Sequence, residues 1–155
     1  MSDRSPPPAI YYEDYAPGVV ETMGSYTVSK EEIVEFASRY DPQPFHLDEA
    51  AANASIFGGL TASSTHTFAL MGLINAKRGV QPAVVANLGA DSLKFPEPVR
   101  PGDTLTLTGE CLTKRVSKSR PGLGIVTSRT CLWNQRGELV METDTKYMVK
   151  LRGAR

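Results

Sequence analysis

A carboxylate and an imidazole lie five positions apart in residues 40–48, which read Tyr-Asp-Pro-Gln-Pro-Phe-His-Leu-Asp. They belong to Asp41 and His46, and the two prolines between them stiffen the chain that carries both side chains. Histidine titrates closest to neutrality of all side chains, so His46 can take and return a proton. Asp41 can share that transfer or orient a water molecule. The pair therefore predicts acid/base chemistry on a water held between the two side chains.

A second chemical element is the start of a predicted helix at Ser63, Ser64 and Thr65. Free backbone N–H groups and the positive end of the helix dipole converge at such a helix start. A thioester carbonyl placed there would be polarised, and its enolate would be stabilised as negative charge develops. Combined with Asp41 and His46, this predicts addition of water to an α,β-unsaturated thioester, or the reverse elimination. The reaction needs no cofactor.

Each of these residues also has an ordinary structural interpretation. An Asp-Pro step such as the one at Asp41 commonly ends a helix, and a single histidine such as His46 is commonly a hydrogen-bonded structural residue. Ser63 has the residue type of a helix cap, and we interpret His66, on the predicted buried helix, as structural. With only two histidines and no cluster of Cys and His, we expect no metal site.

The first half of the chain predicts one strand and three helices. We expect the strand over residues 19–28 and the helices over residues 29–41, 48–55 and 63–78. Ser29 and Glu32 have the spacing of a capping box, in which each side chain bonds the other's backbone N–H group. The longest helix is apolar on nearly every side from Phe68 to Ile74, so we expect it to be buried and to line a tunnel for an acyl chain.

The second half predicts strands over residues 83–95, 104–112, 124–134 and 139–151. Apolar and polar residues alternate in 104–112 and 139–151, which indicates half-buried antiparallel strands. The layout is α+β, and the antiparallel sheet must wrap around the long central helix to bury it, as in a hotdog fold. Such a sheet leaves an uncovered edge strand, so we expect a homodimer or a larger homo-oligomer.

Length and charge narrow the class of protein. The 155 residues suit one domain, and we expect an N-terminal leader over 1–17 and a single domain over 18–152. Lys plus Arg and Asp plus Glu number 17 each, so charge gives no reason to expect nucleic acid or a membrane as partner. Cys111 and Cys131 are far apart in sequence, and residues 1–8 lack the apolar core of a signal peptide. We therefore expect a cytoplasmic protein.

Four segments resemble the MaoC-like dehydratase family, which includes the (R)-specific enoyl-CoA hydratases. The family's hydratase segment reads Asp-x-Asn-Pro-x-His, and a subgroup carries Asp-Pro-Gln-Pro-Phe-His-x-Asp followed by Phe-Gly-Gly-Leu. The matching segments here are Asp41–Asp48 and Phe57–Leu60, with further similarity at Pro98–Asp103 and Asn134–Glu138. The resemblance extends over residues 18–151, nearly the whole chain.

The resemblance implies a hotdog fold, a homodimer or larger assembly, and an acyl-CoA or acyl-carrier thioester as substrate. It implies that Asp41 and His46 are the catalytic pair and that the backbone N–H group at Ser64 is the oxyanion donor. Ser63 and Gln43 are further candidates for substrate binding. The sequence departs from the family where Gln43 replaces Asn and where Ser63 and Ser64 replace a His-Gly pair. The added side chain of Ser64 narrows the space beside the thioester.

Other candidates and two other functions stay open. Basic residues that could contact the phosphates of CoA are Lys94, Arg100, Lys118 and Arg120. The first function is a hydratase or dehydratase, a hydro-lyase, that uses Asp41 and His46. The second is a hotdog thioesterase, in which water attacks the carbonyl carbon. The third is a non-catalytic subunit that binds acyl thioesters.

Overall fold

Five long strands form one antiparallel sheet in the computed structural model, which describes residues 9–154. The order across the sheet is β2-β5-β6-β7-β4, so β2 and β4 are the edge strands. The strands are β2 (Val20–Thr27), β4 (Val84–Lys94), β5 (Thr104–Val116), β6 (Leu123–Trp133) and β7 (Leu139–Lys150). Two short strands, β1 (Ala9–Ile10) and β3 (Gln81–Pro82), pair in parallel outside the main sheet.

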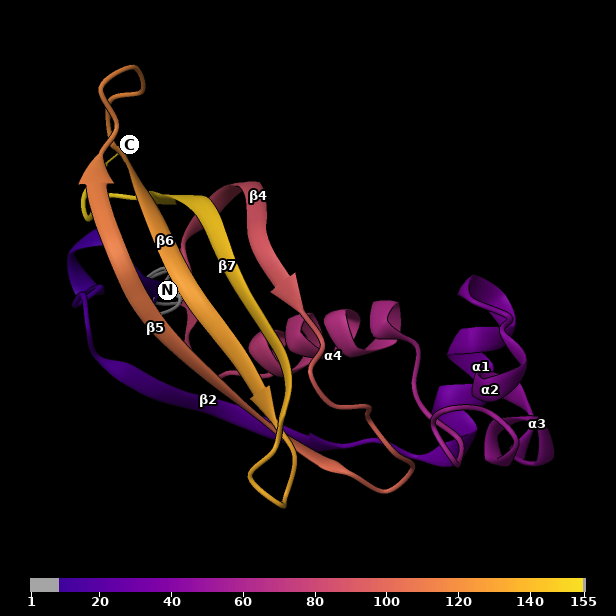
Figure 1. Cartoon of the computed structure of the whole chain (residues 1–155). Coiled ribbons are helices and arrows are strands. Elements are labelled where there is room, and N and C mark those ends of the chain that lie inside the picture. The colour runs from indigo at the N-terminus through magenta and orange to yellow at the C-terminus, as the bar shows by residue number, and fades with distance from the viewer. Residues whose placement is uncertain (1–8, 155) are drawn as a thin grey trace, which may run out of the picture.

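Three helices gather at one end of the molecule, one longer helix lies against the sheet, and a short 3-10 helix packs against β6. They are η1 (Tyr12–Asp14), α1 (Lys30–Tyr40), α2 (Pro44–Leu47), α3 (Glu49–Asn53) and α4 (Ser64–Ala76). Figure 1 shows α1, α2 and α3 grouped beyond the sheet, with α4 running from that group across one face of it. The predicted α+β layout with a long helix against an antiparallel sheet is therefore confirmed.

The core lies between α4 and the sheet. Leu70 and Ile74 of α4 are each 2% exposed, and they belong to one cluster with buried residues of β5, β6 and β7. Leu107, Leu132 and Met141 lie opposite one another on these three strands and are completely buried. This apolar row covers one side of the helix. Ala69 and Gly72 are exposed, so the expected burial on nearly every side is not found within this chain, because the sheet covers only one side of α4.

The start of α1 follows the prediction in part. Ser29 caps the helix, since its Oγ accepts from the N–H group of Glu32 at 3.1 Å. The reciprocal half of the predicted capping box does not form. The carboxylate of Glu32 accepts hydrogen bonds from the hydroxyl of Tyr26 at 3.0 and 3.1 Å and faces His66. Partners that are distant in sequence have replaced the local one.

Residues 9–17 lie in the part of the chain that the sequence assigns to a leader. Within them β1 pairs with β3, and η1 packs against β6, where the ring of Tyr12 covers Gly124. The guanidinium of Arg152 near the C-terminus bonds the carboxylate of Asp14 at 2.5 and 2.6 Å. Residues 9–17 are therefore packed onto the domain, and the rest of the expected leader, 1–8, lies outside the described residues.

Three features expected from composition can be compared with residues 9–154. No helix in this part of the chain is long and apolar enough to cross a membrane. Cys111 and Cys131 are free thiols, and both are buried. Within the same residues, no group of three His, Cys, Asp or Glu side chains is placed to hold a metal ion.

Candidate active site

The Asp/His segment and the start of α4 meet at one pocket of about 460 Å³. Asp41, Gln43, His46 and Ser64 all line it, so tertiary structure brings together four of the residues singled out from the sequence. Asp41 ends α1, Gln43 precedes α2, His46 lies on α2, and Ser64 is the first residue of α4.

His46 is held with one ring nitrogen toward the protein and the other toward Asp41. Its Nδ1 lies 2.6 Å from the carbonyl oxygen of Thr61, and the residue is 6% exposed. A carbonyl oxygen only accepts hydrogen bonds, so Nδ1 carries the proton. In the neutral ring Nε2 is therefore an acceptor, and it lies 3.5 Å from Oδ2 of Asp41. With the ring in its neutral form, two acceptors therefore face each other at the pocket.

Asp41 is positioned by Ser63, which is expected from the sequence to bind substrate but does not itself line the pocket. The hydroxyl of Ser63 donates to Oδ2 of Asp41 at 2.8 Å, and Ser63 is completely buried. The same Oγ accepts from the N–H group of Thr65 at 3.2 Å and so caps α4. Ser63 therefore holds the carboxylate against the start of α4. It stands where the family that the sequence resembles has the histidine of its His-Gly pair.

The start of α4 opens into the pocket at Ser64. Its N–H group is among the first four of the helix, which have no carbonyl partner one turn earlier. Ser64 and Gln43 are both exposed, and both line the pocket. The positive end of the helix dipole and the carboxylate of Asp41 thus lie on the same pocket.

Several wall residues were not singled out from the sequence. They are Phe45, Phe57, Thr61, Ala62, Thr67, Val140 and the segment 95–99. Phe57 opens the Phe-Gly-Gly-Leu motif, so the motif was a usable signal for that residue. Pro98 and Val99 begin the segment Pro98–Asp103, which also resembles the family, so they too had a usable signal. Residues 95–97 and Val140 carry no such signal, because long-range packing alone brings them to the pocket.

The candidate phosphate contacts are placed differently from one another. Lys94 is exposed and directly precedes the wall segment 95–99. Arg100 turns inward, where its guanidinium donates to the carbonyl oxygens of Phe57 and, at 2.9 Å, Gly59. It therefore braces the loop before α4, and we correct its expected role as a phosphate contact.

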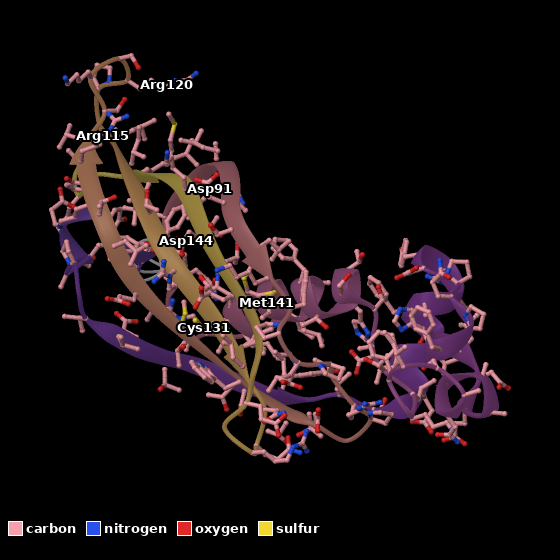
Figure 2. The ribbon with its side chains drawn as sticks, in the orientation of Figure 1. Asp91, Arg115, Arg120, Cys131, Met141 and Asp144 are labelled. Atoms are coloured by element: carbon pink, nitrogen blue, oxygen red, sulfur yellow. The ribbon has the colours of Figure 1, made fainter. Side chains whose placement is uncertain are left out.

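Lys118 and Arg120 lie in the loop between β5 and β6. Figure 2 shows Arg120 at the tip of that loop, at the end of the molecule away from α1, α2 and α3. These two cations are therefore remote from the Asp41 pocket of their own chain. The separation arises because β5 and β6 are long. β5 extends to Val116, four residues beyond the predicted end at residue 112.

His66 lies on the far side of α4 from Ser64. It is 3% exposed, stacks on the ring of Phe36 at 4.5 Å, and has Nε2 3.6 Å from Glu32. Burial lowers the pKa of His66 below its ordinary value, and the neighbouring Glu32 carboxylate opposes that shift. The position agrees with the structural role expected for it, since it packs between helices and does not line the Asp41 pocket.

The amino-acid sequence is similar to a known family over most of its length. The model of the MaoC like domain matches residues 16–131. The uncharacterized protein YdeM of Bacillus subtilis is 30% identical over 139 residues, which cover 89% of this chain and 97% of YdeM. The (R)-specific enoyl-CoA hydratase of Rhodospirillum rubrum is 33% identical over 145 residues, covering 92% of this chain and 94% of the hydratase.

The fold is similar to solved structures of the same kind. A MaoC-like dehydratase from Rhodospirillum rubrum superposes with a TM-score of 0.87 at 39% identity, covering 94% of this chain and all of that one. A Mycobacterium tuberculosis protein with a double hotdog fold gives 0.73 at 21% identity, covering 95% of this chain and 46% of that one. The predicted hotdog fold is confirmed. With a family model matched over residues 16–131 and the predicted dehydratase segment folded into one pocket, the chain belongs to the MaoC-like domain family.

Proposed function

We propose that the protein is a hydro-lyase that adds water to an enoyl thioester or removes it from a 3-hydroxyacyl thioester, with acyl-CoA as the substrate. The observation that carries the proposal is the facing pair of Asp41 and His46, 3.5 Å apart in a pocket that also receives the start of α4. Membership of the family and the similarity to an (R)-specific enoyl-CoA hydratase support it.

The hydrogen bonds of the pair suit a water molecule between them. Nε2 of His46 and Oδ2 of Asp41 are both acceptors, so a water that donates one hydrogen to each would satisfy both. As the water oxygen bonds Cβ of the enoyl group, Nε2 takes one water proton. The pair then returns a proton to Cα, so that H and OH have been added across the double bond.

The start of α4 supplies the other requirement. Negative charge develops on the thioester oxygen while Cβ is attacked, and an N–H group at Ser64 can stabilise that charge. The backbone N–H group is present whether the residue is glycine or serine, so serine in place of glycine preserves the donor. The serine side chain reduces the space beside the thioester.

An exposed edge strand beside the pocket also supports a homodimer. β4 is an edge strand, and its exposed apolar side chains include Val85 at 49%, Leu88 at 46% and Leu93 at 45%. The strand leads directly into pocket segment 95–99. A homodimer through β4 would cover these side chains. Light scattering should give twice the mass of one chain, and Leu88→Lys should shift it toward the monomer.

The test is the absorbance of the conjugated enoyl thioester after mixing the protein with crotonyl-CoA. We expect the signal to fall, and Asp41→Asn and His46→Ala each to slow the fall by about 10²-fold or more. Asp48→Asn is the matched control, because Asp48 caps α3 through the N–H group of Ala51 and does not line the pocket.

The outcomes separate the three candidate functions. Release of free CoA thiol without hydration would indicate a thioesterase. A folded protein that binds enoyl-CoAs but turns over none would indicate a binding subunit. Wild-type turnover in His46→Ala would exclude the assigned pair.

A further inference from the structure

A second hollow of about 420 Å³ lies between the later part of α4 and the sheet. We call it the distal cavity, and its helix wall is formed by Met71, Gly72 and Asn75, with Arg78 lining it just beyond the end of α4. These residues continue the side of α4 that begins at Ser64, because positions three and four apart share a helix face. From residue 64 to residue 75 the helix advances about 16 Å at about 1.5 Å per residue. A chain that leaves the thioester along α4 leads to this cavity.

The sheet side of the distal cavity carries hydroxyl groups where an apolar surface is usual. Thr130 of β6 lies opposite Thr143 of β7, and Ser128 lies opposite Thr145. Residues two apart on a strand share a face, so these four side chains lie together and form what we call the hydroxyl patch. Ser128, Thr130 and Thr145 line the cavity.

The neighbouring row toward the Asp41 pocket is apolar. It consists of Leu107, Leu132 and Met141, all completely buried. Along β7, Val140 lines the Asp41 pocket, Met141 follows it, and Thr145 lines the distal cavity. Figure 2 shows Met141 nearer than Asp144 to the end of β7 beside α4. A bound chain would therefore meet apolar surface first and hydroxyl groups afterwards.

Part of this polar surface lacks hydrogen-bond partners. The Oγ1 atoms of Thr143 and Thr145 are buried without a partner among residues 9–154, as is Oδ1 of Asn75 on the facing helix. Thr143 as a whole is 0% exposed. A buried hydroxyl or amide without a hydrogen bond is costly, and an alkyl chain cannot supply one. Ser128 does have a partner, the hydroxyl of Tyr147 at 2.9 Å.

The charges around the cavity disfavour an anion. Among residues 9–154, Arg78 is the one basic residue that lines the cavity, and it pairs with Glu21 at 3.2 Å. The lining residue Asp14 is already paired with Arg152. Glu110 also lines the cavity and makes no salt bridge within the described residues, so it adds an uncompensated negative charge. A carboxylate at this point would meet net negative charge. A neutral oxygen would meet donors and acceptors without that repulsion.

We infer that the acyl group bound by this protein carries a neutral hydrogen-bonding oxygen, such as a hydroxyl or keto group, in its distal part, where it bonds the hydroxyl patch and Asn75. The inference rests on the proposed function for the placement of the thioester. It defines the substrate as an oxygenated acyl thioester, not a plain fatty acyl one. The apolar row holds the intervening methylene groups.

Calorimetric binding to the full-length protein tests this without requiring turnover. The probes are saturated acyl-CoAs of increasing length and the same chains with a terminal hydroxyl. At the length that reaches the patch, we expect the hydroxylated chain to bind about tenfold more tightly, the effect of one net hydrogen bond. Thr145→Val should remove that preference. The control is Thr127→Val, which lies on the same strand as Ser128 but on the other face.

Each result is decisive. Equal binding of both probes at every length, or a preference that survives in Thr145→Val, would overturn the inference. Failure of the proposed function would give another result: the protein would not hydrate enoyl-CoAs, but it would still prefer the hydroxylated chain. Thr130→Val is a second variant, at another position of the hydroxyl patch that lines the cavity, and it should reduce the preference in the same direction.

Discussion

The hydroxyl of Ser63 donates a hydrogen bond of 2.8 Å to Oδ2 of Asp41, although the two residues lie 22 positions apart in sequence. The bond joins the end of α1 to the start of α4. It fixes the oxygen of Asp41 that faces His46, and the same serine caps the helix whose N–H groups open into the pocket. One side chain thus links both halves of the proposed reaction.

We predict that Ser63→Ala lowers both hydration and stability. Loss of the bond frees Asp41 to rotate, so kcat for crotonyl-CoA should fall about tenfold, a typical effect of losing one net hydrogen bond. Loss of the cap should cost about 1 kcal/mol of unfolding free energy.

The matched control is Ser29→Ala. Ser29 caps α1 in the same way, through the N–H group of Glu32, and does not line the pocket. It should lose about the same stability with kcat unchanged, as urea unfolding and initial rates would show. Equal kcat in the Ser63 and Ser29 variants would contradict the positioning role.

The second prediction concerns Arg100. Its forked guanidinium holds the carbonyl groups of Phe57 and Gly59, in the loop that leads to Thr61. Lysine cannot make the forked contact, so Arg100→Lys should lower the unfolding free energy by about 1–3 kcal/mol. Since the carbonyl of Thr61 orients His46, hydration should slow as well.

Arg115→Lys provides the comparison for Arg100. Arg115 is exposed near the far end of β5, as Figure 2 shows. Surface substitutions of this kind change stability by about 0.5 kcal/mol or less. Chemical denaturation of both variants measures the difference, and similar midpoints would argue against the loop-bracing role of Arg100.

The third prediction is a pH dependence of stability from His66. Burial lowers the pKa of this side chain below its ordinary value of 6.5, so the unfolded chain binds a proton more readily than the folded one. The stability that comes from burying neutral His66 is fully present above pH 6.5, the ordinary pKa of histidine, and is lost as pH falls below it. His66→Phe keeps a ring against Phe36 and removes the titration.

Melting temperatures from about pH 8 down to about pH 5 measure this effect of burial. The wild-type protein should lose more stability than His66→Phe below the ordinary histidine value. Glu32, which faces His66, is present in both proteins and opposes the shift in the wild type. Parallel curves for the two proteins would show that His66 contributes nothing to acid sensitivity.

The fourth prediction concerns the packing of residues 9–17. A Cβ at Gly124 would lie 2.1 Å from a ring carbon of Tyr12, which is closer than two carbon atoms can approach without a bond. Because Tyr12 belongs to the short N-terminal segment, Gly124→Ala should displace that segment before it disrupts β6. Limited proteolysis should then cut within residues 9–17 faster than in the wild type.

Gly79→Ala is the control for added bulk, because a Cβ there meets no atom within 4 Å. It should leave the cleavage rate unchanged. Unchanged protection in Gly124→Ala would mean that the ring of Tyr12 moves aside while the segment stays in place.

Much of the fold could be predicted from the sequence because the signals are local. The spacing of apolar residues and the cap at Ser29 predict α1, and Ser63 marks the start of α4 within one residue. Alternation along residues 139–151 predicts β7 closely. Such patterns depend on which side of a helix or strand faces the core, and neighbouring residues are enough to express that.

Short-range structure without periodicity was harder to predict. The predicted helices ended at residue 41 and resumed at residue 48, so α2, which lies between them, was not predicted, and neither was β1 or β3. A two-residue strand has no pattern of its own, and it exists only because another segment lies beside it.

At the candidate site, too, the sequence predicted the local features and missed the contacts between distant residues. The sequence by itself determined which residue types could move a proton, since Asp41 and His46 lie in one proline-stiffened segment, and which helix start could polarise a carbonyl. Only the tertiary structure decided that Ser63 bonds Asp41, that Arg100 turns inward, and that the hydroxyl patch faces α4. These relationships join residues from different helices and strands, so they follow from packing and strand register, which no local pattern specifies.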